Sequence, residues 1–200
     1  MAPRTPKPLA PKPLGRPRAR VGGIDTRQKL VLAAVKEFGQ GGFAGTDTNR
    51  IARRAGFAPQ TFYRWFRDKT EIFIAVYRLW EEDEREMIDG LVAANAKPAE
   101  IVDAAIAHHR DYLVFRRSLR ALSVEDADIR AARAESRKRQ IERLKGWMKP
   151  SRKTPSEIAA TLLQMERLAD AIAEGEFADL GLDEKAARDM LVELQLGLRR

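Results

Sequence analysis

Almost every segment after residue 22 has the apolar spacing of an α-helix, which restricts this chain to folds built from helices. Apolar residues recur every three or four positions, alternating apolar and polar runs are few, and Ala, Leu, Glu and Arg are abundant. No Asn-Gly pair marks a β-hairpin turn. We therefore predict an all-α fold.

The first 22 residues differ in composition from the rest of the chain. They hold six of the ten prolines and six basic groups with no acidic group, and little that could form a core. Such a segment does not bury enough apolar surface to fold. We expect residues 1–22 to be a disordered basic tail.

The positive charge of the chain lies entirely in its first eighty residues. The net charge of +8 divides into +6 for residues 1–22, +5 for 23–80 and −3 for 81–200. This distribution is typical of a module that binds a polyanion, joined to a domain with another task. A basic segment that serves only solubility is the alternative.

Three short helices separated by glycine-containing turns are predicted between residues 25 and 66. Asp25 is placed to cap a first helix that ends near Phe38, before a Gly-rich turn. A second helix starts near Thr46 or Asp47 and stops before Gly56, and Pro59 opens a third.

The stretch FAPQTFYRWFRDK, residues 57–69, combines aromatic and cationic side chains. On a helix over residues 59–67, Phe62 and Phe66 share one apolar face with Trp65 beside them. The opposite face carries a polar set that suits base edges and phosphates, namely Gln60, Tyr63, Arg64 and Arg67. A helix, a tight turn and a second helix with a polar outer face form a helix-turn-helix. A solvated helical bundle is the alternative at this point.

The longer string GFAGTDTNRIARRAGFAPQTFYRWFRDKTEIFIAV resembles the DNA-binding domain of the TetR (tetracycline repressor) family of bacterial regulators. The resemblance covers about residues 24–78. The residues that carry it are Gly42-Phe43, Thr46, Ile51-Ala52, Ala55-Gly56, Thr61-Phe62-Tyr63, Phe66 and Lys69. It implies a sequence-specific DNA-binding transcriptional regulator, a repressor that a small molecule releases, and not an enzyme. It also implies three parts: the tail over 1–22, a helix-turn-helix domain over 23–69, and a helical effector-binding and dimerisation domain over 70–200.

The resemblance implies roles for single residues. Contacts to DNA phosphates are expected from Tyr63, Lys69, Thr48 and Arg50. Base contacts are expected from the third helix, at Gln60, Thr61 and Arg64, with Pro59 at its start. Ala58 replaces a frequent Ser cap, which leaves the first N–H groups of this helix free.

The tail contains GRPR, residues 15–18, which resembles the core of an AT-hook. In such a segment, Arg16 and Arg18 would lie in a narrow minor groove. The other interpretation is a nonspecific basic tail.

The C-terminal part is predicted to contain five further helix starts. A long helix begins near residues 68–70 and ends near Asn95, and Pro98 opens one helix whose apolar stripe runs from Ile101 to Leu122. Later starts are indicated by SVED at 123–126, TPSE at 154–157 and LDEKA at 182–186. The last two helices carry more apolar residues than a monomer core needs, which favours a homodimer; ordinary monomer core is the alternative.

Polar groups on apolar stripes suggest an effector pocket, with Asp83, His108, Tyr112, Phe115 and Met165 as candidates. A satisfied core histidine and an exposed aspartate are the competing interpretation. No metal site or cofactor is predicted, because His108 and His109 point about 100° apart on a helix.

Two other functional classes are compatible with parts of the sequence. An architectural protein that coats DNA with little sequence preference agrees with the tail and the net charge. A hydrolase that uses His108 or His109 with Asp111 lacks a nucleophile motif. The chain has no cysteine, no apolar run long enough to span a bilayer and no secretory signal, so we expect a cytoplasmic protein. Its expected partners are a near-palindromic DNA operator, a second copy of itself and an unidentified small molecule.

Overall fold

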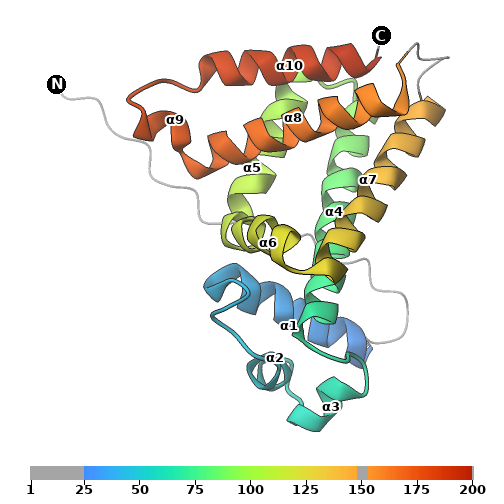
Figure 1. Ribbon diagram of the computed structural model, residues 1–200, viewed down its shortest axis with the longest axis vertical. Coiled ribbons are helices and arrows are strands. Elements are labelled where there is room, and N and C mark those ends of the chain that lie inside the picture. The colour runs from blue at the N-terminus through green and yellow to red at the C-terminus, as the bar shows by residue number, and fades with distance from the viewer. Residues whose placement is uncertain (1–24, 148–152, 200) are drawn as a thin grey trace.

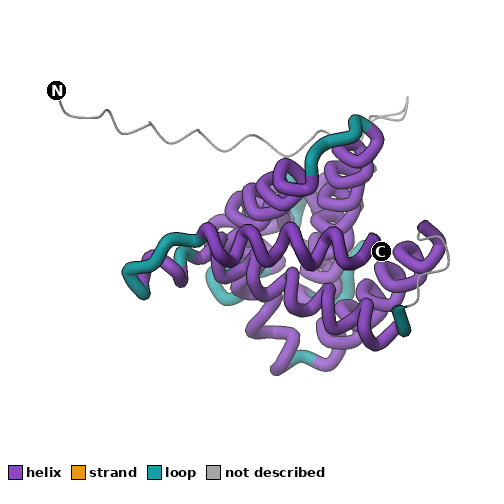
Figure 2. The backbone as a smooth tube through the Cα atoms, turned by 90° about the horizontal axis from the view of Figure 1, so that it is seen from above, coloured by secondary structure: helices purple, strands orange, loops and turns teal. Residues whose placement is uncertain are grey.

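The computed structural model describes residues 25–147 and 153–199, and all regular elements in these ranges are helices. Figures 1 and 2 show their arrangement. The helices are α1 (Thr26–Gly41), α2 (Thr48–Arg54), α3 (Pro59–Tyr63), α4 (Lys69–Ala93), α5 (Pro98–Asp111), α6 (Leu113–Glu125), α7 (Ala127–Trp147), α8 (Pro155–Glu174), α9 (Glu176–Asp179) and α10 (Lys185–Arg199). The expected all-α fold is confirmed.

Local signals in the sequence set several helix starts. Asp25, Asp47 and Asp68 each accept a hydrogen bond from the backbone N–H three residues later, at the starts of α1, α2 and α4. Thr154 and Glu157 form the capping box of α8. Ala58, as expected, provides no side-chain cap for α3.

The helix predicted over residues 59–67 differs from the observed one at its C-terminal end. Helix α3 ends at Tyr63 instead of continuing to Arg67, because the chain must turn there to enter α4. Trp65 is therefore 44% exposed and does not join Phe62 and Phe66 in the core. The Arg67 guanidinium pairs with Asp68 at 2.7 Å.

The helix predicted from Pro98 to Leu122 is divided at Tyr112 into α5 and α6. Its two halves pack in different places. Val102 and Ile106 of α5 pack with α8 and α10, whereas Phe115 and Leu119 of α6 pack with the first four helices. A single straight helix could not pack against both of these hydrophobic clusters. Asp126 still marks the next start, since its Oδ1 accepts from the backbone N–H of residues 128 and 129 at the beginning of α7.

The larger hydrophobic core joins the helix-turn-helix to the remainder of the chain. It contains residues of α1, α2 and α3 together with Phe73 of α4, Phe115 of α6 and Ile129 of α7. The rings of Phe73 and Phe115 lie 4.8 Å apart between centroids. The domain boundary predicted between residues 69 and 70 stays a prediction, because this hydrophobic core contains residues from both sides of it.

The turn after α1 is also held by α6. Gly42 has φ of +65°, and a Cβ there would lie 2.8 Å from Ser118 Oγ. The Phe43 N–H donates to the same Oγ at 3.0 Å. The close approach and the positive φ together explain glycine at residue 42.

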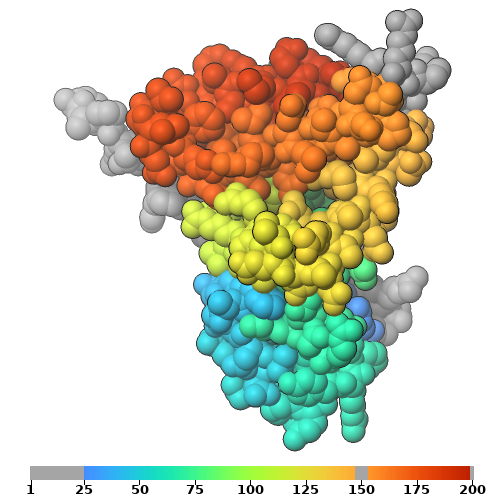
Figure 3. Space-filling view, in the orientation of Figure 1, coloured from blue at the N-terminus to red at the C-terminus, as the bar shows by residue number. Residues whose placement is uncertain are grey.

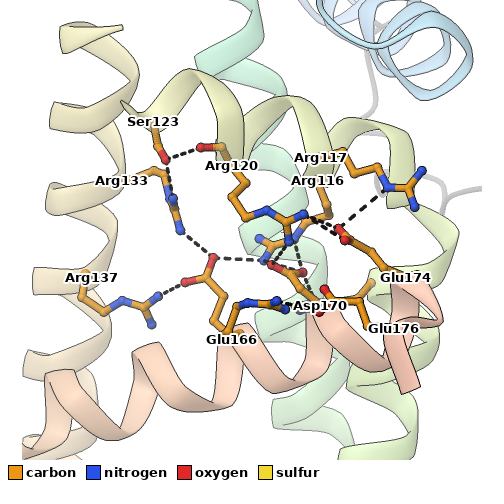
Figure 4. A network of polar contacts seen from close by, with 12 residues as sticks. Arg116, Arg117, Arg120, Ser123, Arg133, Arg137, Glu166, Asp170, Glu174 and Glu176 are labelled. Carbon is orange, nitrogen blue, oxygen red and sulfur yellow. Dashed lines mark hydrogen bonds and ion pairs between the residues drawn. The ribbon is translucent and has the colours of Figure 1, made fainter. Parts of the chain in front are cut away.

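A network of buried charges connects α6, α7 and α8 (Figure 4). Arg116 is 4% exposed, and its Nη2 lies 3.0 Å from both Asp170 oxygens and from Glu166 Oε1. Arg133 and Arg137 of α7 bind the same Glu166 carboxylate. Burial opposes ionisation of Asp170, but hydrogen bonds from His109 and Arg116 outweigh it and lower the pKa of this carboxyl.

We expect Asp170→Asn to destabilise the protein strongly. The amide keeps the volume of the carboxylate but removes one of the two negative charges that neutralise Arg116. Removing one partner of a buried ion pair costs roughly 3 to 5 kcal/mol, so the free energy of unfolding in urea should fall by about 3 kcal/mol or more. Asp189→Asn is the control, because Asp189 pairs with Lys185 on an exposed face of α10. Equal stability of the two variants would contradict this assignment.

Candidate nucleic-acid interface and effector cavity

The outer face of α3 is polar and its inner face is aromatic. Phe62 and Phe66 are at most 1% exposed, whereas Tyr63 is 58% exposed, and Gln60 and Arg64 are also exposed. Burial of the rings fixes the rotation of the segment, so these polar side chains must face outward. Helices α1 to α3 lie at one end of the molecule and α8 and α10 at the other (Figure 3).

The phenol of Tyr63 also ties α3 to α2. Its hydroxyl lies 3.0 Å from Thr48 Oγ1, close enough for a hydrogen bond with either atom as the donor. Thr61, Pro59 and Thr48 are half-buried. The start of α2 and the end of α3 therefore present their polar groups side by side.

The other two predicted phosphate contacts, Lys69 and Arg50, also have partners within the protein. Lys69 Nζ donates to the backbone carbonyls of Phe43 at 2.8 Å and Thr46 at 3.1 Å, and burial lowers its pKa. Arg50 is exposed, with its Nη1 3.3 Å from Gly45 O and its Nε 3.4 Å from Glu37. Both residues hold the turn between α1 and α2, which leaves them only part of their donor capacity for DNA.

Glu37 is the buried anchor of this turn. It is 4% exposed, accepts from Thr46 Oγ1 at 2.8 Å and lies 2.5 Å from Arg54 Nε. Burial opposes its ionisation, but the hydrogen bonds from Arg54 and Thr46 prevail and lower its pKa. Arg54 is thereby held against α1.

Two exposed side chains were not among the predicted DNA contacts. Arg53 makes no ion pair with any described residue, as is also true of Arg64. Trp65 is exposed beside the outer face of α3. The basic character of α2 around Arg53 could be seen in the sequence. The exposure of Trp65 could not, because it follows from the early end of α3. Arg16 and Arg18 lie outside the described residues.

A cavity of about 640 Å³ lies in the C-terminal part, between α4, α5, α7, α8 and α10. Its apolar lining includes Ile88, Val92, Ile101, Ile106, Leu162 and Leu191. Its polar lining includes Glu84, Asp89, His109, Arg116, Arg137, Gln140, Arg143, Glu166 and Gln195. The volume is in the range of small-molecule sites.

The five candidate pocket residues lie in different places. Met165 lines this cavity, whereas Phe115 is buried in the larger core and Tyr112 packs against that core. His108 stacks on Trp80 at 5.3 Å between ring centroids. Asp83 is half-buried on α4, where burial and neighbouring carboxylates raise its pKa to about 6. Only Met165 of the five belongs to the lining.

His109, rather than His108, faces the cavity. Ile101 and Ala105 of the predicted stripe line the cavity, but the buried face of α5 also includes Val102, Ile106 and His109 in place of His108. Burial disfavours the charged ring, but hydrogen bonds to Asp170 and Glu84 outweigh this and raise the pKa of His109. The two ring nitrogens lie 2.9 Å and 3.3 Å from these carboxylates. With both nitrogens occupied, the ring is not arranged to activate a nucleophile.

Two further observations concern the class of protein. Across residues 25–147 and 153–199, no helix combines the length and apolarity needed to cross a membrane. The same ranges contain no group of three or more His, Asp or Glu side chains arranged to hold a metal ion.

Comparisons with known proteins agree with the helix-turn-helix. Residues 30–76 match the family model for bacterial regulatory proteins of the tetR family. The chain is 29% identical over 84 residues to the uncharacterised HTH-type transcriptional regulator YdgC of Bacillus subtilis. This stretch is 42% of the chain and 43% of YdgC, so it covers less than half of that relative.

Solved structures show that the whole fold is shared. A TetR-family transcriptional regulator from Rhodococcus sp. superimposes with a TM-score of 0.64 at 16% identity, covering 88% of this chain and 98% of that one. FadR from Bacillus subtilis, solved in complex with stearoyl-CoA, gives a TM-score of 0.50 at 19% identity, covering 86% and 96%. At these identities the likeness concerns the fold alone. The helix-turn-helix of this chain, at residues 30–76, is therefore that of the bacterial regulatory proteins of the tetR family.

Proposed function

We propose that this protein is a sequence-specific repressor that binds DNA as a homodimer and is released by a small-molecule effector. The observation that carries the DNA-binding role is the outward face of α3, where Gln60, Tyr63 and Arg64 are exposed over buried Phe62 and Phe66. These side chains offer amide, phenol and guanidinium groups, which recognise base edges and phosphates in a major groove.

The roles within this face follow from the partners of each side chain. Arg64 and Gln60 are exposed and have no hydrogen-bond partner among the described residues, which supports a role in reading base edges. The hydrogen bond between Tyr63 and Thr48 supports a phosphate contact for Tyr63. Lys69 retains one ammonium N–H beyond its two carbonyl partners, and this can serve a phosphate as well. A protein with these roles acts on chromosomal DNA, so it belongs in the cytoplasm.

The exposed apolar side chains of α8 and α10 support a homodimer. Leu163 and Met190 are each 55% exposed in a single copy. A second copy packed on these helices would cover them and place two α3 helices in successive major grooves, about 34–36 Å apart. The cavity supports an effector, and the same fold holds stearoyl-CoA in FadR.

The effector and the DNA can communicate through α6. Arg116 lines the cavity, and the neighbouring Phe115 packs on Phe73 in the core of the helix-turn-helix. A ligand that moves Arg116 would displace Phe115 with it, because both lie on one helical turn. The distance between the two α3 helices of a dimer would then no longer match the operator.

We expect Arg64→Ala and Tyr63→Phe to affect DNA binding differently. The binding site is first selected from genomic fragments with the full chain, and affinities are then measured by fluorescence anisotropy. Arg64→Ala should lose a base contact, which should weaken binding by about 1 to 3 kcal/mol and relax the sequence preference. Tyr63→Phe should lose a phosphate contact, which should weaken binding to all DNA sequences alike. Arg64 has no side-chain partner among the described residues, so Arg64→Ala should hardly change thermal unfolding. Tyr63→Phe loses an exposed hydrogen bond with Thr48, so its melting temperature should fall slightly.

Lys138→Gln is the control for these variants, because it removes an exposed charge from α7, away from α3. If Arg64→Ala binds the selected site as tightly as the unaltered protein, α3 does not read the operator. If selected and random DNA bind equally, the chain is an architectural protein that coats DNA.

We expect Leu163→Arg combined with Met190→Arg to produce a monomer that no longer binds the operator. Two charges per copy would be buried in the interface without partners. Sedimentation velocity measures the mass, and Val124→Arg is the control, since Val124 is 74% exposed at the end of α6. A dimer that survives the double substitution would place the interface elsewhere.

A further inference from the structure

The charged side chains that line the cavity differ in whether they form ion pairs with other side chains. Each lining carboxylate has a cationic partner: Glu84 lies 3.3 Å from His109, Asp89 lies 2.9 Å from Arg85, and Glu166 binds three arginines. A cationic ligand would have to compete with these partners. The lining therefore offers no unpaired negative charge.

Arg143 is the exception among the lining cations. It is half-buried on α7, and it makes no hydrogen bond or ion pair within the described ranges. Its charge acts at longer range on Glu82 of α4, where a hydrogen bond from Arg85 and the charge of Arg143 both lower the pKa of that carboxyl. Gln140 lies one turn earlier and also lines the cavity. Its Oε1 accepts from Arg137 Nη1 at 2.7 Å, so the amide N–H groups of Gln140 are left for another acceptor.

Trp80 of α4 adds one more hydrogen-bond donor to the lining. Trp80 is 4% exposed and lines the cavity, and its Nε1 has no partner among the described residues. The Trp80 ring already stacks with His108 and with the Arg116 guanidinium, at 5.3 Å and 4.5 Å from its centroid. A cationic ligand could therefore stack on the Trp80 ring only by displacing His108 or Arg116.

Most of the remaining lining is hydrocarbon. Side chains of α4, α5, α8 and α10 provide it, among them Val92, Ile101, Ile106, Leu162 and Leu191. Such a surface binds a hydrocarbon body, and each additional buried methylene group strengthens binding about fourfold. The free donors favour a ligand that combines a hydrocarbon body with a head group that accepts hydrogen bonds. Gln195 Oε1, a buried acceptor of the lining without a partner among the described residues, can receive a donor of the same ligand.

We propose that the cavity binds an amphipathic anion whose carboxylate or phosphate head is held by Arg143 and Gln140 and whose hydrocarbon chain lies among the apolar side chains. This identifies the chemical class of the effector and rests on the proposed function. Arg143 acts as the residue that selects the charge of the ligand. Its guanidinium makes charge-assisted hydrogen bonds to either type of head.

Binding to the full chain in the absence of DNA tests the proposal. Isothermal titration calorimetry compares four probes with the same ten-carbon alkyl chain, all below their micellar concentrations: undecanoate, decyl phosphate, decanol and decyltrimethylammonium. At least one anion should bind about tenfold more tightly than the alcohol and the ammonium ion. The stronger of the two anions shows whether the natural head is a carboxylate or a phosphate.

Arg143→Gln should weaken the affinity for the more tightly bound anion about tenfold and change the affinity for decanol less than twofold. This variant should fold normally, because Arg143 has no ion pair to lose, and circular dichroism checks this. Lys138→Gln removes a cation from the same helix outside the lining, so it should leave all four affinities unchanged. Equal binding of decanol or the ammonium ion, binding of none of the probes, or no effect of Arg143→Gln would overturn the proposal.

The role of the ligand in regulation is read separately, from the affinity for the selected DNA with and without the bound anion. An anion that binds through Arg143 without changing DNA affinity supports the cavity assignment and contradicts effector release. Release of DNA by a different ligand, with no anion bound, supports effector release and overturns the cavity assignment.

Discussion

The packing of α6 against two different partners is the constraint on which the structure depends. Phe115 reaches the core of the helix-turn-helix, where its ring lies 4.8 Å from that of Phe73. The next residue, Arg116, points to the cavity and the buried carboxylates of α8. Because adjacent helical residues point about 100° apart, one short helix can contact both regions only if it lies between them. The DNA-binding end and the cavity are therefore mechanically joined.

The charges around Arg116 give this junction a defined geometry. Burial of several ionised groups is costly unless each finds its partners, and here Asp170, Glu166 and His109 supply them. Such a network tolerates few alternative arrangements, since each altered contact would leave a buried charge unpaired. Under the proposed function, a ligand beside this network would favour one discrete arrangement of it over another.

The DNA-binding end uses its cations for two purposes. Arg54 and Lys69 are bound to groups of the protein, to Glu37 and to backbone carbonyls, and they shape the turn before α2. Arg53 and Arg64 have no such partner among the described residues. A basic composition alone does not separate these roles, because a guanidinium serves a carboxylate and a phosphate equally well. The distinction depends on where Glu37 is buried.

Local signals in the sequence were sufficient for the fold class, for most helix starts and for the orientation of α3. Caps act over three residues, and the burial of Phe62 and Phe66 follows from their spacing, so the exposed positions of Gln60, Tyr63 and Arg64 could be predicted. The break at Tyr112, the exposure of Trp65 and the cavity residues Glu84, His109 and Arg143 were decided only by tertiary structure. These depend on which distant helix lies opposite each residue, and a packing partner sixty residues away leaves no trace in the local spacing of apolar side chains.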